Sequence, residues 1–138
     1  MKKLFLDTNV IIDVLVRLEE FFLASANILE LGATGRCHLY ATALSFINGL
    51  YISRRTLGSV VALEHIKVLR NFVDVSPMGK REFDQALLIE GKDVEDNLQY
   101  CSALASHCNA IITRNKKDFP QNGPIAVFTP MEYLEQFK

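Results

Sequence analysis

Short apolar segments that alternate with segments of helical spacing are the feature that most restricts the fold of this chain. The strand candidates lie at Lys3–Leu6, Cys37–Tyr40, Val73–Val75, Ala110–Ile112 and Ile125–Phe128. Residues with helical apolar spacing separate most of them from the next strand. This pattern predicts an α/β fold, a three-layer α/β/α sandwich with a central, mostly parallel sheet of four to five strands.

The segments between the strands predict seven helices. They are expected at Thr8–Leu15, Glu19–Leu31, Thr42–Arg55, Ser59–Phe72, Lys80–Ile89, Val94–Cys108 and Met131–Phe137. Gly32 and Gly35 are expected to end the second helix, because glycine commonly follows a last helical turn. The 138 residues contain no internal repeat or linker-like tract, so we expect one domain, residues 1–138.

Composition is typical of a globular protein. Hydrophobic residues make up 49% of the chain and charged residues 22%, which favours a packed core over disorder. The net charge of −1 gives no overall attraction to nucleic acid, although a local basic patch remains compatible with it. The three cysteines form no paired framework, and no apolar run is long enough to span a membrane. We expect a soluble cytoplasmic protein without a signal peptide.

Polar residues directly follow two of the expected strands. Asp7 comes after Lys3–Leu6, and Thr113, Arg114 and Asn115 come after Ala110–Ile112. Ligands in parallel sheets bind beyond the carboxyl ends of the strands, so both sets should lie at one edge. Taken alone, Asp7 is equally well explained as the N-cap of the next helix.

Further acids occur in the second half of the chain. Asp93, Glu95 and Asp96 open a predicted helix, where Asp93 alone would be interpreted as an N-cap, and Asp118 lies in "TRNKKDF". Carboxylates that converge in one cleft repel each other unless a cation is shared between them. Ligand sets made only of oxygen favour hard ions such as Mg²⁺ or Mn²⁺. Together with Asp7, these acids predict metal-dependent phosphodiester chemistry.

Three stretches of the chain resemble the PIN-domain ribonucleases. They are "FLDTNVIIDVL", "DVEDNLQYCSALA" and "IITRNKKDF", in the order and at the separations found in that family. The chain is similar to the branch that includes the toxins of bacterial VapBC-type toxin–antitoxin pairs. The resemblance implies a compact α/β/α fold, an acidic site that holds Mg²⁺ or Mn²⁺, and endonucleolytic cleavage of RNA. It also implies two protein partners, a small antitoxin and a second copy of the chain in a homodimer.

The resemblance also assigns roles to individual residues. Catalysis and metal binding fall on three acids, Asp7, Asp96 and Asp118, with Asp93 as a further candidate metal ligand. Orientation of substrate, water or phosphate falls on four polar residues, Asn9, Asn48, Thr113 and Asn115. The last acidic position of the family motif matches either Asn115 or Asp118, and Asp118 is the stronger ligand. Lys116 and Lys117 adjoin this site and are candidate phosphate contacts.

One position departs from the family pattern. A glutamate is usual on the helix after the second strand, but in "ATALSFINGLY" that position is Asn48. An amide oxygen can ligate a cation without contributing charge, so metal affinity should be lower. A catalytically weakened PIN domain that binds RNA or protein is therefore an alternative. A haloacid dehalogenase-like phosphatase also begins with a strand and an Asp, but it needs a second Asp where this chain has Asn9.

Overall fold

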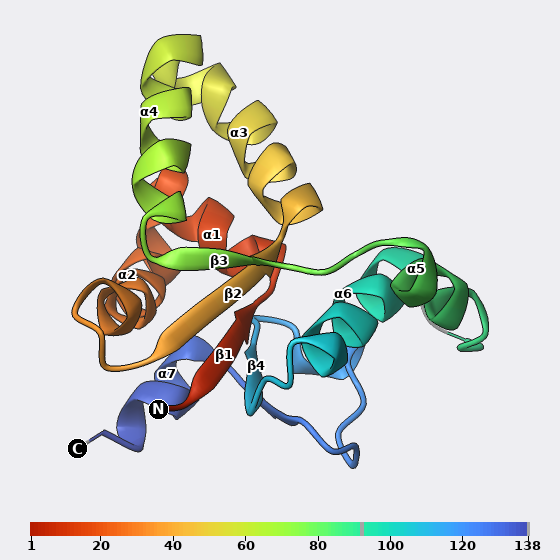
Figure 1. The fold of residues 1–138 in the computed structure, drawn as a ribbon. Helices are drawn as coiled ribbons and strands as arrows, with labels where there is room; N and C mark the ends of the chain where they lie inside the picture. Colours follow the sequence, from red (N-terminus) through yellow and green to blue (C-terminus); the bar gives the residue numbers. More distant parts are fainter. Residues whose placement is uncertain (92, 138) are drawn as a thin grey trace.

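The computed structural model describes residues 1–91 and 93–137 and contains a five-stranded sheet with helices on both faces (Figure 1). The strands are β1 (Lys3–Leu6), β2 (His38–Thr42), β3 (Val73–Ser76), β4 (Ala110–Ile112) and β5 (Ala126–Phe128). Their order across the sheet is β3-β2-β1-β4-β5, and each neighbouring pair is parallel. The predicted α/β sandwich with a parallel sheet is confirmed.

The helices lie where the apolar spacing predicts them, with ends that differ by a few residues. They are α1 (Thr8–Leu15), α2 (Glu19–Ala33), α3 (Ala43–Leu57), α4 (Ser59–Arg70), α5 (Lys80–Leu87), α6 (Val94–Ala105) and α7 (Pro130–Glu135). A short 3₁₀-helix at Lys116–Asp118 was not predicted. In Figure 1, α3 and α4 form a hairpin that extends away from the sheet. No helix in the described part of the chain is long and apolar enough to cross a membrane.

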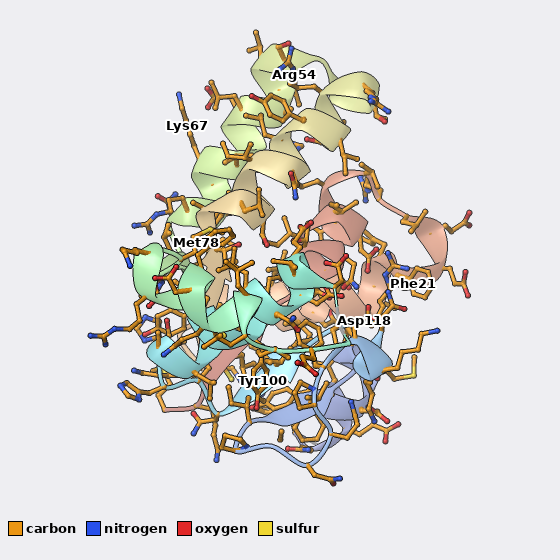
Figure 2. All side chains as sticks on the ribbon, turned by 90° about the vertical axis from the view of Figure 1, so that its right-hand side faces the viewer. Phe21, Arg54, Lys67, Met78, Tyr100 and Asp118 are labelled. Atoms are coloured by element: carbon orange, nitrogen blue, oxygen red, sulfur yellow. The ribbon has the colours of Figure 1, made fainter. Side chains whose placement is uncertain are left out.

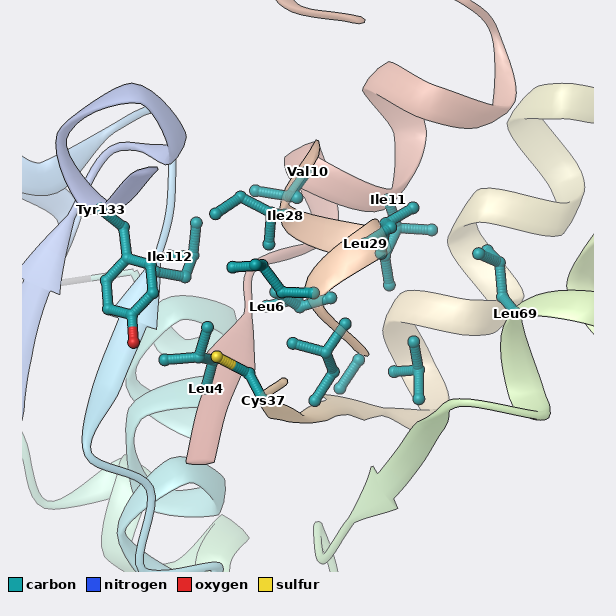
Figure 3. Close-up of a cluster of buried hydrophobic side chains, with 14 of the residues drawn as sticks. Leu4, Leu6, Val10, Ile11, Ile28, Leu29, Cys37, Leu69, Ile112 and Tyr133 are labelled. Carbon is teal, nitrogen blue, oxygen red and sulfur yellow. The ribbon is translucent and has the colours of Figure 1, made fainter. Parts of the chain in front are cut away.

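The core lies on both faces of the sheet because side chains alternate along each strand. Leu4 and Leu6 of β1 point to the face that α1 and α2 cover, where they pack with Ile112 of β4 (Figure 3). Phe5 and Ile111 point to the opposite face, where they join residues of α6. Burying a side chain of this kind contributes about 1.5–3 kcal/mol, so β1 and β4 anchor both helix layers.

The end of α6 differs from the prediction. The helix was expected to continue to Cys108 but ends at Ala105, because His107 adopts a left-handed conformation with φ of 56°. The amide of Cys108 donates to the Ala103 carbonyl at 3.1 Å and that of His107 to the Leu104 carbonyl at 3.0 Å. These two bonds form a Schellman motif, which glycine usually marks in a sequence. A histidine at this position gave no sign of the helix end.

The predicted role of Gly32 is also corrected. Helix α2 continues through Gly32, and Gly35, with φ of 74°, provides the left-handed residue after the helix. A Cβ atom on Gly32 would lie 2.6 Å from Cγ of Leu39 and 3.3 Å from the carbonyl oxygen of Phe72. Gly32 therefore allows α2 to approach β2 closely rather than ending the helix.

The connections between strands create a site at one edge of the sheet. The chain builds β1, β2 and β3 in one direction, and then adds β4 and β5 on the other side of β1. Ligands in parallel sheets bind where the strand order reverses in this way. The register pairs Leu6 with Ile112, and the backbone N–H of Asp7 donates to the Ile112 carbonyl at 3.0 Å. Asp7 and Thr113 therefore leave the sheet side by side.

Candidate active site

Asp7 is the most firmly held acid at this edge. Its Oδ1 accepts the backbone N–H of Thr8 at 2.7 Å, so it does cap α1. Its Oδ2 accepts the hydroxyl of Thr113 at 2.7 Å and the side-chain amide of Asn9 at 3.2 Å. The two explanations of Asp7 from the sequence are thus compatible, because one oxygen caps the helix while the other joins polar residues from two strand ends.

The environment of Asp7 makes its negative charge costly. The side chain is 5% exposed, and this burial raises the pKa of Asp7 above its ordinary value. Hydrogen bonds from Thr113, Gln99 and Thr8 lower the pKa again, whereas the negative charge of Asp118 raises it. A cation near Asp7 would remove this repulsion and favour the ionised form.

A cavity of about 350 Å³ opens beside Asp7 at the carboxyl edge of β1 and β4. Its acidic lining residues are Asp7, Asp93, Glu95, Asp96 and Asp118, and its other lining residues are Thr8, Asn9, Ile12, Gln99, Arg114 and Asn115. The acids come from the start of α1, from the start of α6 and from the 3₁₀-helix. Three segments that are far apart in sequence thus contribute carboxylates to one space.

Asp96 shows how strongly these carboxylates interact. Burial raises its pKa most, and the charges of Asp118, Asp7, Asp93 and Glu95 raise it further, to about 6. The charges of four other acids act on Asp96, so these carboxylates lie within electrostatic range of one another. A divalent cation that neutralises them would therefore stabilise the site.

Asp93 has a structural role as well. Its Oδ1 accepts the backbone N–H groups of Glu95 at 2.9 Å and of Asp96 at 3.2 Å, so it is the N-cap of α6. The helix-capping explanation from the sequence is correct for this residue. Asp93 also lines the cavity, so capping does not remove it from the acidic set.

The chemistry of the lining residues fits a hydrated hard cation. The donors are carboxylate, amide and hydroxyl oxygens, which suit Mg²⁺ or Mn²⁺. Among residues 1–91 and 93–137, no three His, Cys, Asp or Glu side chains are arranged to hold one ion together. Mg²⁺ commonly binds through one or two carboxylates and keeps several waters. The spacing of these acids therefore fits an ion that keeps several of its water ligands.

Access to the cavity differs among three of the predicted orienting residues, Asn9, Thr113 and Asn115. Asn9 and Asn115 line it, and the Oδ1 of Asn9 accepts the backbone N–H of Arg114 at 3.3 Å. Thr113 is fully buried and contacts Asp7 instead of lining the cavity, while its hydroxyl oxygen accepts the Asn115 N–H at 3.0 Å. The Thr113 hydroxyl thus orients Asp7, and its role in positioning water or phosphate stays a prediction.

Asn48 lies beside the site but is not among the described residues that line the cavity. Its side-chain amide donates to Oε1 of Glu95 at 3.3 Å. The described contact of Asn48 thus reaches the cavity through Glu95, and the role of Asn48 in orienting substrate stays a prediction. The loop after β4 is different, since both Asn115 and Asp118 line the cavity and Asp118 acts on the pKa of Asp7 and Asp96.

Two residues that line the cavity, Gln99 and Arg114, have no role predicted from the sequence. Gln99 is buried, lies three residues after Asp96 on α6 and hydrogen-bonds with Asp7. Helical spacing from Asp96 would have identified it, because residues three apart share a helix face. Arg114 belongs to the polar stretch after β4 and is a basic residue that lines an acidic cavity.

A sequence model of the PIN domain matches residues 3–117. The chain belongs to the PIN domain family. Ribonuclease VapC1 of Aquifex aeolicus (strain VF5) is 29% identical over 141 residues, covering 99% of this chain and 96% of that protein. The family resemblance of the three sequence stretches is thereby confirmed, and the acidic cavity lies within a PIN domain.

Two solved structures share the fold of this PIN domain. VapBC-1 from nontypeable Haemophilus influenzae matches with a TM-score of 0.67 at 15% identity, over 94% of this chain and 98% of that one. VapBC2 from Rickettsia felis, bound to a DNA fragment from the promoter, matches with a TM-score of 0.63 at 16% identity. That match covers 92% of this chain and 98% of the Rickettsia chain. At these identities the likeness concerns the fold.

The raised pKa of Asp96 predicts how stability without metal depends on pH. Asp96 takes up a proton near pH 6 in the folded state but only near 3.8 in the unfolded state. The folded state binds more protons between these values, so this residue lowers the free energy of unfolding as pH rises through the interval. We expect Asp96→Asn to be more stable than wild type at pH 7 without metal, by a margin that shrinks toward pH 4.

Urea unfolding of both proteins in chelator, at several pH values, measures this margin. Asp84→Asn is the matched control, because Asp84 pairs with Lys80 on α5 and does not line the cavity. A difference between Asp96→Asn and wild type that stays constant across the interval would contradict the repulsion inferred for Asp96.

Proposed function

We propose that this PIN domain is an endoribonuclease that depends on Mg²⁺ or Mn²⁺. The observation that carries the proposal is the set of five carboxylates around one cavity, at the point of the sheet where the strand order reverses. Mutual repulsion among these acids supports it, because a bound cation would offset the negative charges that raise the pKa of Asp96. The similarity to a ribonuclease of Aquifex aeolicus over nearly the full length of both chains supports RNA as the substrate.

In this proposal Asp7, Asp96 and Asp118, with Asp93 beside them, would surround a hydrated metal ion, with one or two of the carboxylates as direct ligands and the others bound through water. Once bound, the ion supplies an activated water and stabilises charge on the scissile phosphate. Thr113 keeps the Oδ2 atom of Asp7 in a fixed orientation through its 2.7 Å hydrogen bond. Two residues that line the cavity, Asn9 and Asn115, offer amide groups that orient water or phosphate oxygens.

We further propose that the chain is the toxin of a toxin–antitoxin pair, acting in the cytoplasm and forming a homodimer. Support comes from the two VapBC structures that share its fold and from the ribonuclease VapC1 relative. If a small open reading frame adjoins the gene, we expect its product to co-purify with this chain and to suppress RNA cleavage. Size-exclusion chromatography and a cleavage assay of the co-expressed pair test this. Independent elution of the two proteins would contradict it.

The metal mechanism predicts the behaviour of Asp7→Asn. Purified wild type should cleave single-stranded RNA in Mg²⁺ or Mn²⁺ and lose this activity in excess chelator. Asp7→Asn removes a charged metal ligand but keeps an oxygen that can cap α1, so it should fold, bind Mn²⁺ at least tenfold more weakly and cleave at least about a hundredfold more slowly.

Isothermal titration with Mn²⁺ and a gel assay of a labelled RNA measure these two quantities. Asp84→Asn again provides the control, because it removes an equal charge outside the cavity. Cleavage that continues undiminished in chelator would exclude the metal mechanism. Equal Mn²⁺ affinity of wild type and Asp7→Asn would leave Asp7 as a helix cap only.

A catalytically weakened PIN domain is the second candidate function, and the amide at Asn48 is the observation that favours it. Asn48 contacts Glu95, which lines the cavity. Asn48→Glu would set a like charge beside Glu95, whereas Asn48→Ala only removes the hydrogen bond. We expect Asn48→Glu to lower the melting temperature of the metal-free protein more than Asn48→Ala, and Mn²⁺ to restore it.

Thermal melts of both variants, with and without Mn²⁺, test this expectation, and cleavage rates show whether the added carboxylate raises activity. A faster Asn48→Glu enzyme would mean that the amide weakens the wild-type site. Identical melts of the two variants under both conditions would mean that position 48 has no electrostatic link to the cavity.

A further inference from the structure

Arg114 is the only basic side chain among the described residues that line the acidic cavity. It lies directly after β4, between Thr113 and Asn115. A cavity with five carboxylates repels an RNA backbone, so the position of a single cation in its wall has a large effect on where a phosphate can bind. The contacts that hold the guanidinium group of Arg114 therefore affect where a phosphate can bind.

Two side chains hold the guanidinium from different sides. Its Nε lies 3.0 Å from Oδ2 of Asp13, a residue of α1 that is 0% exposed. Its Cζ lies 4.2 Å from the centroid of the Phe21 ring on α2. The hydroxyl of Ser25 donates to the same Oδ2 of Asp13 at 3.1 Å, which fixes the carboxylate in turn. An arginine held by an ion pair and an aromatic ring has little freedom to move away.

The arrangement is costly for a purely structural contact. A fully buried carboxylate loses its hydration, and removal of its partner would leave an uncompensated charge in the core. Oδ1 of Asp13 has no hydrogen-bond partner in the described part of the chain, so the carboxylate is only partly satisfied. The contacts with Asp13 and Phe21 fix the position of the guanidinium. Arg114 lines both the acidic cavity and a neighbouring cavity of about 400 Å³ that Phe21 and Ser25 also line.

The contact geometry also leaves part of the guanidinium available. The ion pair with Asp13 is formed by Nε at 3.0 Å, without hydrogen-bond geometry among the described atoms, and the two Nη groups carry the other four N–H bonds of an arginine. The Arg114 side chain is 26% exposed, so water or a ligand reaches it. Its backbone N–H is held separately by Asn9, which ties the whole residue to the start of α1. Paired Nη groups in a fixed plane match the oxygens of a phosphate.

We propose that Arg114 binds a phosphate of single-stranded RNA next to the scissile one, and that Asp13 and Phe21 are positioning residues that hold Arg114 for this contact. The inference rests on the proposed ribonuclease function and deepens it. Arg114 offsets the repulsion between the acidic wall and the RNA backbone at one defined point. Because the contact is to a flanking phosphate, it contributes to substrate binding and not to the chemical step.

Steady-state cleavage of a labelled single-stranded RNA in Mn²⁺, at several salt concentrations, tests the proposal. Arg114→Met should raise KM about tenfold with little change in kcat, as expected when binding that is equal in ground and transition states is lost. It should also reduce the slope of log kcat/KM against log salt by about 0.7, the value of one phosphate contact on a single strand. Arg114→Lys should keep the slope, because it keeps the charge, but should raise KM by a smaller factor.

Arg114→Met leaves Asp13 as an unpaired buried charge and is expected to lower stability. The double variant Asp13→Asn/Arg114→Met removes both charges and should fold, because replacing both members of a buried pair is far less disruptive than removing one. It should show the same rise in KM and the same loss of slope as the single variant. Arg54→Ala and Lys67→Ala are matched controls, since both side chains lie on the α3–α4 hairpin, far from Asp118 (Figure 2).

The outcomes separate this inference from the proposed function. Unchanged KM and salt slope in a folded double variant, with active wild type, would overturn the role of Arg114 and leave the ribonuclease proposal intact. A fall in melting temperature alone would mean that Arg114 is structural and would overturn the role equally. Absence of RNA cleavage by wild type in Mn²⁺ would overturn the proposed function and this inference with it.

Discussion

The parallel pairing of β1 with β4 is the constraint on which the rest of the site depends. This pairing aligns the carboxyl ends of the two strands, so that Asp7 and Thr113 meet in a 2.7 Å hydrogen bond. The loop after β4 then carries Asp118 to the same cavity, and α6 adds its first-turn acids from the other side. The apolar residues of β1 and β4, packed against helices on both faces, keep these two strands in register.

Repulsion between the carboxylates is the second constraint on the site. Burial and, to a smaller extent, neighbouring carboxylates raise the pKa of Asp7 and Asp96, and the protein holds the acids together through caps and buried hydrogen bonds. Asp7 and Asp93 each cap a helix with one oxygen, so the local folding of α1 and α6 stabilises the same residues that repel one another. Helix capping thus offsets part of the cost of an acidic site, and a bound cation offsets more.

Much of this could be predicted from the sequence, because strand and helix patterns are local and the polar residues after β1 and β4 are adjacent to apolar runs. The α/β sandwich and the PIN family are confirmed. The contacts that depend on packing could not be predicted in this way. Nothing local indicates that Asp13 pairs with Arg114, that Thr113 is buried or that Asn48 faces Glu95. The end of α6 was missed because His107, not a glycine, takes the left-handed position.

The separation of the paired strands has a consequence for how the site forms during synthesis. Asp7 and Thr113 are 106 residues apart in sequence. Their hydrogen bond can form only after β4 has been synthesised and has paired with β1. Domains fold as units once their interacting segments have been made, and contacts between distant residues form late. A ribosome-bound chain that has emerged only as far as β3 therefore carries Asp7 without Asp96, Thr113 or Asp118. The acidic cavity is complete only when the chain has left the ribosome as far as Asp118.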